Sequence, residues 1–219
     1  MRSKIKKEKI PEFFASLYYE LASLNYQLYV DLAIEISQEF IPKNSDLEIL
    51  DIGVGPGLLI AEIAKQRPEV KIYGIDLTRK WGTYLQQNKR RFNFCLADIN
   101  FLPFSENYFN LIISTGVLHA LRNPEGALNE CYRVLRSNGK AIIYDPIPLS
   151  HEIEGLSLEN RIKGLIYKLY KKIFPGHPKY LPPEKARNII AHTKFKKGKI
   201  ENRRFESQNY LKIVLKKGE

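Results

Sequence analysis

Three glycines and the acid before them offer the clearest chemistry in this sequence. The glycines alternate with other residues in Gly53-Val54-Gly55-Pro56-Gly57, directly after the apolar segment 48–52. A turn of this kind lets backbone come close to a ligand at the carboxyl end of a strand. Asp51 stands two residues before the first glycine, where a carboxylate would repel a pyrophosphate and suit a ligand that carries an ammonium group. The turn therefore predicts a binding site for an amino-acid-like group.

Two further acids extend this predicted site, and one position argues against a dinucleotide. The dinucleotide fingerprint needs a glycine at position 58, which is Leu58 here. Asp76 closes the expected strand 70–75, where it could accept hydrogen bonds from both hydroxyls of a ribose. Asp98 follows the expected strand 92–96, where it could accept a hydrogen bond from an exocyclic amine while Ile99 covers a purine ring. An amino acid, a ribose and a purine together describe S-adenosylmethionine.

The elements around these residues alternate in a way that predicts a doubly wound α/β fold. Strands are expected at 48–52, 70–75, 92–96, 109–114 and 139–144, with helices at 58–67, 78–90 and 124–135. Such alternation favours a mostly parallel sheet. Apolar residues at helical spacing predict one helix or a broken pair from Phe13 to Phe40. Further helices are expected near 158–173 and 184–192, and strands at 199–205 and 210–215 that suit an antiparallel edge.

Short motifs along the chain resemble those of class I S-adenosylmethionine-dependent methyltransferases. The nearest subgroup is the type 11 set, which includes quinone and sterol-like C-methyltransferases. The motifs are Asp51-Ile52-Gly53-Val54-Gly55-Pro56-Gly57, Gly74-Ile75-Asp76, Ala97-Asp98-Ile99, Leu102-Pro103-Phe104, Phe109-Asn110-Leu111-Ile112, Val117-Leu118-His119 and Arg133-Val134-Leu135. The resemblance implies a Rossmann-like sheet of seven strands, mostly parallel with an antiparallel last strand, together with N-terminal helices and a helical insertion before the last two strands.

The resemblance also implies how the chain is organised and which residues bind the cofactor. A single domain is expected over 1–219, with an N-terminal helical cap at 1–44, a cofactor-binding core at 45–145, a basic helical insertion or lid at 146–196 and C-terminal strands at 197–219. The predicted cofactor is S-adenosyl-L-methionine. The predicted cofactor-binding residues are Asp51, Gly53, Gly55, Gly57, Asp76, Leu77, Asp98, Ile99 and Ser114.

His119 and Asp145 are the candidate catalytic residues. A methyl group on a sulfonium is already a good electrophile, so its transfer depends mainly on in-line positioning, and a base is needed only when the acceptor is protonated. His119 follows the fourth strand and could act as that base, or it could pack or anchor a loop. Asp145 ends the fifth strand and could face the substrate, or it could be the turn acid before Pro146. Amino-group methyltransferases carry an Asn/Asp-Pro-Pro-aromatic motif after the fourth strand. Asp145-Pro146 follows the fifth strand instead, so methylation of adenine or glutamine amino groups is not favoured.

Charge divides the chain into two unequal parts. The 35 Lys and Arg residues against 24 Asp and Glu give a net charge of +11. Residues 1–149 hold 18 basic and 17 acidic groups, and residues 150–219 hold 17 and 7. Within 161–204, 14 basic residues stand against Glu184 and Glu201. Such a segment suits a solvated face, a substrate lid, RNA or an anionic membrane surface.

Together these observations predict a methyltransferase that acts by in-line displacement on a small-molecule or lipid-like acceptor. An RNA methyltransferase that uses residues 161–204, and a partner that binds S-adenosylmethionine without catalysis, remain as alternatives. Cys95 and Cys131 give neither a disulfide framework nor zinc spacing, and no metal is expected. A cytoplasmic location is expected because there is no signal-like start and no apolar run of about 18 residues. Three tyrosines of the opening helix could form a lid or simply pack: Tyr18, Tyr19 and Tyr26.

Overall fold

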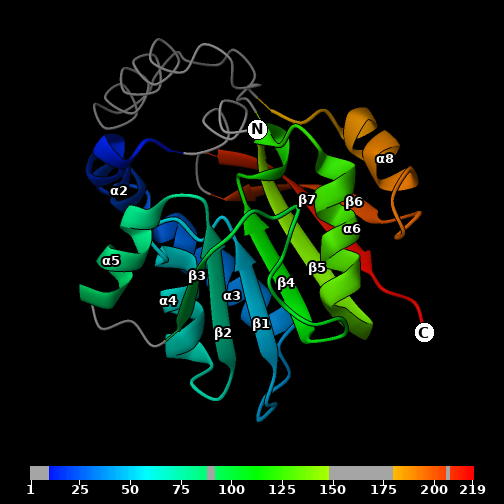
Figure 1. Ribbon diagram of the computed structural model, residues 1–219, viewed down its shortest axis with the longest axis horizontal. Helices are drawn as coiled ribbons and strands as arrows, with labels where there is room; N and C mark the ends of the chain where they lie inside the picture. The colour runs from blue at the N-terminus through cyan, green and yellow to red at the C-terminus, as the bar shows by residue number, and fades with distance from the viewer. Residues whose placement is uncertain (1–9, 88–91, 148–179, 206–207) are drawn as a thin grey trace.

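A seven-stranded sheet in the order β3-β2-β1-β4-β5-β7-β6 lies at the centre of the structure (Figure 1). The structure is a computed structural model that describes residues 10–87, 92–147, 180–205 and 208–219. The strands are β1 Glu48–Ile52, β2 Lys71–Asp76, β3 Asn93–Leu96, β4 Phe109–Thr115, β5 Leu135–Ile147, β6 Lys199–Phe205 and β7 Gln208–Lys216. Strands β1 to β5 pair in parallel, whereas β7 runs antiparallel to both β5 and β6. The predicted sheet and its antiparallel last strand are confirmed.

Helices cover both faces of the sheet. They are η1 Glu12–Phe14, α2 Ala15–Ser23, α3 Tyr26–Glu39, α4 Leu58–Gln66, α5 Arg79–Gln87, η2 Leu118–Ala120, α6 Pro124–Val134 and α8 Pro183–Ala191. Helices α2 to α5 pack into one apolar core and α6 and α8 into the other (Figure 1). The opening helix is the broken pair α2 and α3, and the helix expected near 158–173 lies outside the described residues. None of the described helices combines the length and the apolar character needed to cross a membrane.

The start of β5 corrects one expectation. A strand is expected at 139–144, but β5 begins earlier, at Leu135, directly after α6. Its register against β4 shifts between the Phe109–Leu135 pair and the Leu111–Lys140 pair, so the residues between these two pairs form an irregularity inside the strand. Asn138 takes a φ of 63° there, which Asn tolerates better than most residues. The pairing with β4 continues on both sides of this irregularity.

A buried lysine joins helix α3 to the antiparallel edge of the sheet. The side chain of Lys212 on β7 is 1% exposed, and its Nζ lies 2.5 Å from Glu35 Oε1 and 2.7 Å from Glu39 Oε2, both on α3. The hydroxyl of Tyr144 on β5 also donates to Glu35 Oε1, at 2.7 Å. Glu201 on β6 completes the group, with Oε1 3.8 Å from Lys212 Nζ. We call Lys212, Tyr144 and the three glutamates the Lys212 cluster.

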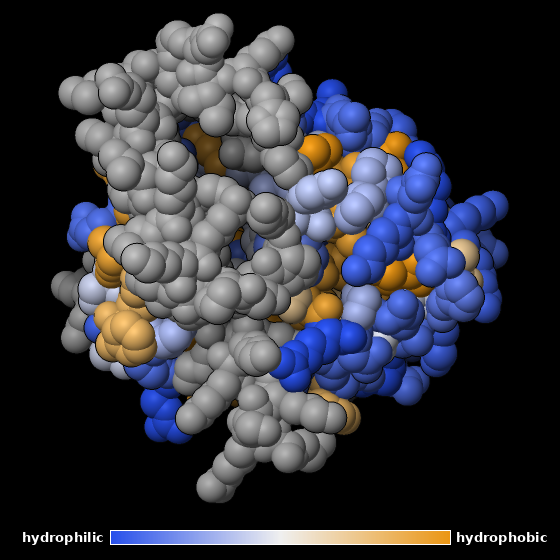
Figure 2. Space-filling view, turned by 90° about the horizontal axis from the view of Figure 1, so that it is seen from above, coloured by the Kyte–Doolittle hydropathy of each residue, from blue (hydrophilic) through white to orange (hydrophobic). Residues whose placement is uncertain are grey.

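The chain changes direction across the sheet between β1 and β4. Strands β2 and β3 follow on one side of β1, whereas β4 lies on its other side. At the carboxyl end of β1, Ile52 pairs with Ile75 of β2 and with Ser114 of β4. In open α/β sheets the ligand crevice lies outside the strand ends at such a switch point. In the view onto the top of Figure 1, hydrophobic side chains gather beside the grey part and hydrophilic ones form the outer rim on the right (Figure 2).

Candidate functional site

The glycine turn after β1 needs glycine for two reasons. Gly53, Gly55 and Gly57 all take positive φ values, of 70°, 51° and 71°, a conformation that side chains other than glycine rarely adopt. The turn is also tightly packed. A Cβ atom on Gly53 would lie 2.3 Å from Val117 Cγ2, and one on Gly57 would lie 2.7 Å from Leu85 Cδ2. The loop that follows β4 and helix α5 therefore close directly onto the turn.

Gly55 and Asp76 are in direct contact at the predicted ligand site. The backbone N–H of Gly55 donates to Asp76 Oδ2 at 3.1 Å, and the N–H of Thr78 donates to Asp76 Oδ1 at 2.8 Å. Burial raises the pKa of Asp76, while these backbone hydrogen bonds act in the opposite direction. Each carboxylate oxygen can accept more than one hydrogen bond, so both keep capacity for a diol. A Cβ on Gly55 would meet nothing nearer than Gly53 O at 3.9 Å, so the crevice is open there.

Asp51 is an acid buried beside another acid. It is 3% exposed, and burial, followed by the charge of Asp76, raises its pKa well above the ordinary value. Within the described ranges no Lys or Arg forms an ion pair with either carboxylate. Tyr29 on α3 lies close by, because its pKa is raised first by burial and then by Tyr210 and Asp51. This end of the crevice favours a cation.

Asp98 lies in the loop after β3 with one oxygen already engaged. Its Oδ1 accepts from the backbone N–H of Asn100 at 2.9 Å and from Asn100 Nδ2 at 3.1 Å. Asn123, which caps α6 by accepting from the N–H of Gly126, donates to Asn100 Oδ1 at 3.1 Å. The capped start of α6 therefore holds the Asp98 loop in place, and Ile99 beside it is 8% exposed. The remaining oxygen, Oδ2, is where an amino group could donate.

Ser114 and Leu77 complete the set of predicted cofactor-binding residues. Ser114 is 5% exposed, and its hydroxyl donates to the carbonyl of Ile52 at 3.2 Å, which links β4 to β1. Its side chain thus has a structural partner at the floor of the crevice. Leu77 follows Asp76 and is half-buried. The described structure brings the predicted acids, glycines and these two residues to one edge of the sheet.

The two candidate catalytic residues are in contact with each other. His119 lies in η2, and its Nδ1 forms a hydrogen bond with Asp145 Oδ1, while its backbone N–H donates to Asp145 Oδ2 at 3.2 Å. Asp145 is fully buried, and the side chain of His119 is 15% exposed. Asp145 is not a turn acid, because β5 continues to Ile147 and Asp145 pairs with Leu211 of β7. Two positions chosen separately from the sequence are therefore one pair in space.

Three tyrosines of α2 and α3 contact the helices α4 and α5. Tyr18 lies 5.9 Å from Trp81 and Tyr19 lies 4.5 Å from Tyr84, measured between ring centroids. Tyr26 donates a hydrogen bond to Glu62 on α4. Tyr18 and Tyr19 thus pack against aromatic side chains of α5, whereas Tyr26 is 41% exposed.

Sequence reasoning missed two tyrosines that interact with acids of the site. Tyr29 interacts with Asp51, and Tyr210 interacts with Asp145. The pKa of Tyr210 is raised by burial and then by Tyr18 and Asp145. Tyr29 shares a helical face with Ala33 and Ile36, which are buried, so its position on the core stripe was the available signal. Tyr210 precedes Lys212 by two residues on β7 and points to the same face of the sheet.

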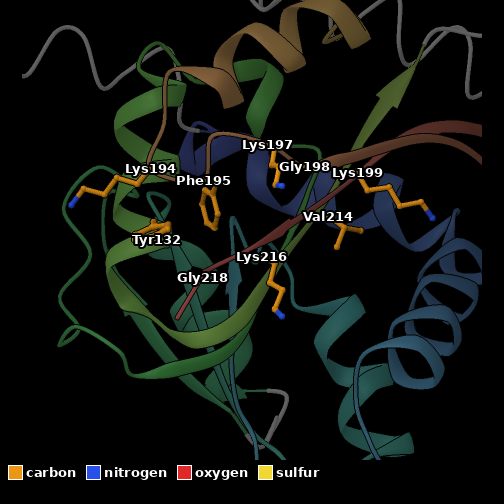
Figure 3. Close-up of a pocket in the computed structure, with 9 residues that line it drawn as sticks. All are labelled: Tyr132, Lys194, Phe195, Lys197, Gly198, Lys199, Val214, Lys216 and Gly218. Atoms are coloured by element: carbon orange, nitrogen blue, oxygen red, sulfur yellow. The ribbon is translucent and has the colours of Figure 1, made fainter.

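A basic pocket lies near the amino end of β5, at the end of the sheet opposite the glycine turn. It has a volume of about 630 Å³ and is lined by Tyr132, Phe195 and four lysines, Lys194, Lys197, Lys199 and Lys216 (Figure 3). Lys194 and Lys199 point away from each other at its two ends (Figure 3). Lys216 pairs with Lys140 at the amino end of the regular part of β5, five residues and roughly 17 Å before Asp145. The pocket thus lies near the amino ends of the parallel strands, whereas the glycine turn lies at their carboxyl ends.

Searched over the described residues, no three His, Cys, Asp or Glu side chains come together as a metal site. Cys131 is buried, and burial raises the pKa of its thiol to about 12, which leaves it un-ionised.

Comparisons with known proteins agree with this geometry. A family model described as a methyltransferase domain matches residues 50–143. A demethylmenaquinone methyltransferase from Thermotoga maritima is 24% identical over 143 residues, which cover 65% of this chain and 56% of that protein. A ubiquinone/menaquinone biosynthesis C-methyltransferase from Desulfotalea psychrophila is 28% identical over 111 residues, or 48% of this chain and 44% of the relative. The chain thus spans about half the length of these curated relatives.

Solved structures show the same fold. The crystal structure of a proposed S-adenosyl-L-methionine-dependent methyltransferase from Methanococcus maripaludis matches with a TM-score of 0.74 at 22% identity, over 95% of this chain and 94% of that one. A phosphoethanolamine N-methyltransferase from Haemonchus contortus, in complex with S-adenosylhomocysteine, matches with a TM-score of 0.65 at 16% identity, over 94% and 59%. Residues 50–143 match the model of a methyltransferase domain, and the strand order and the glycine turn of the structure agree with that match.

Proposed function

We propose that the protein transfers the methyl group of S-adenosylmethionine to a small-molecule acceptor. The observation that carries this proposal is the edge of the sheet at which the glycine turn and three acids meet. Asp51, Asp76 and Asp98 lie at the ends of the neighbouring strands β1, β2 and β3. An ammonium group, a ribose diol and an aminopurine are the ligand groups that this series of carboxylates would recognise.

The described side chains fit such a cofactor. Asp51 is buried, Asp76 is partly buried, and neither has a cationic partner in the described ranges, so an ammonium group at Asp51 would relieve their mutual repulsion. Gly55 leaves open space beside Asp76 for a ribose. Asp98 keeps one oxygen for an exocyclic amine, next to Ile99. When bound, S-adenosylmethionine supplies a methyl group on a positively charged sulfur, which is a good electrophile.

The position of the basic residues supports a small acceptor over RNA. Among the described basic residues, the lysines of the pocket lie at the edge of the sheet opposite the glycine turn. RNA bound there would be held away from the crevice. The curated relatives include enzymes named for demethylmenaquinone and for ubiquinone and menaquinone biosynthesis, which also favours a small, apolar acceptor. The part of the basic segment at 148–179 lies outside the described residues.

Calorimetric titration of the purified protein with S-adenosylmethionine, S-adenosylhomocysteine and NAD⁺ tests the cofactor assignment. We expect both adenosyl compounds to bind and NAD⁺ not to bind, since Leu58 replaces the third dinucleotide glycine. At a concentration of one hundred times Kd, either ligand should stabilise the fold by about 2.7 kcal/mol. Binding of NAD⁺ alone, or of none of the three, would overturn the proposal.

A methyl-transfer assay separates an enzyme from a binding partner that lacks activity. The protein is incubated with S-adenosylmethionine that carries a labelled methyl group and with a panel of small acceptors, and S-adenosylhomocysteine is quantified. An Asp76→Asn variant is the matched control, because it removes the carboxylate that faces Gly55. Turnover in the parent and loss in the variant support an enzyme. Tight cofactor binding without turnover on any acceptor, total RNA included, would favour the binding partner, and turnover on RNA alone the RNA enzyme.

A further inference from the structure

We propose that the basic pocket beside β7 binds a small organic anion, one that carries two or more separated negative charges on an apolar body. The pocket lies at the end of the sheet opposite the glycine turn. The inference therefore goes beyond the proposed function and does not rest on it. The crevice at the glycine turn favours a cation, whereas this pocket favours a ligand of the opposite charge.

Three of the four lysines that line the pocket have no counter-charge among the described residues. Lys194, Lys197 and Lys216 form neither an ion pair nor a side-chain hydrogen bond with any residue that the structure describes. The fourth, Lys199, has its Nζ 2.7 Å from Glu201 Oε2. All three unpaired lysines are exposed, so a ligand can reach their ammonium groups from solvent. The pocket thus carries a local surplus of positive charge that an anion would neutralise.

The acids near these lysines are engaged by other cations. Glu130 accepts from Arg133 Nε at 2.8 Å, and its pKa is lowered first by this hydrogen bond and least by the charge of Lys194. Glu201 lies against Lys199, and its Oε1 is also 3.4 Å from Arg203 Nε. Neither acid is therefore left to balance the three unpaired lysines.

The loop after α8 that carries two of these lysines is fixed by its own contacts. Thr193 is 1% exposed, and its hydroxyl donates to a carbonyl of α8 at 2.7 Å. The backbone N–H of Lys194 donates to Asn129 Oδ1 at 2.8 Å. A Cβ on Gly198 would lie 2.4 Å from Leu215 Cδ2, so the loop rests directly on β7. A ligand would meet a backbone that is already ordered, which lowers the entropic cost of binding.

The floor of the pocket is apolar. Phe195 is 6% exposed and packs edge to face on Tyr132, with 5.1 Å between the ring centroids. Val214 of β7 lies beside them in the lining. The Nζ of Lys217 is 4.9 Å from the centre of the Tyr132 ring, so a cation is already held against this aromatic group. An inorganic ion would leave the apolar floor uncovered, whereas an apolar or aromatic body would cover it.

The four ammonium groups surround the pocket instead of converging on one point. Lys194 and Lys199 extend from its two ends in opposite directions, and Lys216 lies on β7 below Lys197 (Figure 3). Separate positive charges around one pocket match separate negative charges on one molecule. The volume of about 630 Å³ falls within the range of about 300–1,000 Å³ that is usual for small-molecule sites. These features favour a small organic polyanion over a single phosphate or sulfate.

Calorimetric titration with three probes tests the assigned class of ligand. Naphthalene-1,5-disulfonate carries two separated charges on an aromatic body, naphthalene-1-sulfonate carries one charge on the same body, and sulfate has no apolar body. We expect the disulfonate to bind at least about threefold more tightly than the monosulfonate, and sulfate to bind more weakly than both. Added potassium chloride should weaken the disulfonate, because exposed charges are screened. Saturating S-adenosylhomocysteine should leave its affinity unchanged.

Single lysine substitutions separate a site from general attraction to a basic protein. Lys197→Gln removes an ammonium group of the pocket, whereas Lys185→Gln removes an exposed one on α8 that is outside the lining. We expect Lys197→Gln to weaken the disulfonate about threefold, the double variant with Lys216→Gln about tenfold, and Lys185→Gln to bind like the parent. Both pocket lysines are exposed and unpaired, so urea unfolding of the variants should match the parent.

Each outcome of these titrations bears on the proposal. Disulfonate binding that the pocket variants weaken and Lys185→Gln does not supports it. Absence of disulfonate binding, equal affinities for disulfonate and sulfate, or equal losses in Lys197→Gln and Lys185→Gln would make the pocket a solvated basic face and overturn it. Competition with S-adenosylhomocysteine would move the probe to the crevice and also overturn it. Total RNA that binds where the disulfonate does not, with loss in the pocket variants, would assign the pocket to nucleic acid instead.

Discussion

Two groups of acidic side chains lie on the same face of the sheet and differ in their partners. In the Lys212 cluster, Glu35 and Glu39 meet a lysine that is 1% exposed. In the crevice, Asp51 and Asp76 meet each other, and no cation of the described residues pairs with them. A paired buried charge ties elements together, whereas an unpaired buried acid has a raised pKa and favours an external cation. From this difference we infer that Glu35 and Glu39 serve structure, and the proposed function assigns Asp51 and Asp76 to the ligand.

The largest expected effect is a loss of stability when the Lys212 cluster loses its lysine. Lys212→Met should lower the free energy of unfolding by about 3 kcal/mol, because it leaves partly buried glutamates without their cation. S-adenosylmethionine affinity per folded molecule should stay unchanged. Urea unfolding and calorimetry measure the two quantities. Lys71→Met, at the exposed pair with Asp46, is the control and should unfold like the parent. A stable Lys212→Met with weakened cofactor binding would reverse the roles of the two groups.

The next largest effect is expected on cofactor affinity when Asp76 loses its charge. Asp76→Asn should weaken S-adenosylmethionine about 100-fold, because it removes a charged acceptor from two hydroxyl hydrogen bonds that contribute about 1.5–3 kcal/mol each before compensation. Circular dichroism should show that the fold remains. Asp46→Asn changes a surface acid and should bind normally. Equal affinities of the two variants would remove Asp76 from the site.

The pH dependence of binding distinguishes Asp51 from an ordinary surface acid. Its pKa is raised in the fold, so folding favours the protonated carboxyl. The stability contribution of Asp51 is therefore greatest in acid and falls as the pH rises from 3.8 through the raised pKa. An ammonium group favours the ionised form, so S-adenosylmethionine affinity should rise over that window, by up to about tenfold per pH unit. Asp51→Asn should abolish this slope in calorimetry, and a slope that persists would assign it to another group.

The smallest effect is expected at Ser114. Its hydroxyl donates to Ile52 O at the floor of the crevice, so Ser114→Ala should lower the free energy of unfolding by about 1 kcal/mol. Cofactor affinity should change by less than about threefold, because the hydroxyl already has a partner within the sheet. A loss of tenfold or more in Kd without a loss of stability would give Ser114 a direct contact with the ligand.

Much of this fold could be predicted because its signals are local. Strand β1 begins and ends where the apolar run 48–52 does, and α6 starts at the Asn123 cap and Pro124. The glycines and strand-end acids of the crevice follow from that order of elements. The predicted start of β5 at residue 139 was wrong. Asn138 and Gly139 form a local irregularity within the strand, and pairing with β4 continues on both sides of it.

Contacts between distant parts of the chain could not be predicted in the same way. His119 and Asp145 are 26 residues apart, and their pairing depends on where η2 folds back over β5. Lys212 and Glu35 are 177 residues apart, and no local pattern marks either as buried. Tyr29 was missed because it comes near Asp51 only after α3 has packed on the sheet. Topology, more than propensity, brings these pairs together.

The contact between Gly53 and Val117 restricts how the protein can diverge. A side chain at 53 would enter the space of Val117, and the loop after β4 carries His119 two residues further on. Position 117 therefore lies under a mutational constraint set by a turn that it does not belong to. Within this loop, substitutions that leave the glycine turn undisturbed are therefore expected from η2 onward, while the Gly53–Val117 contact stays fixed.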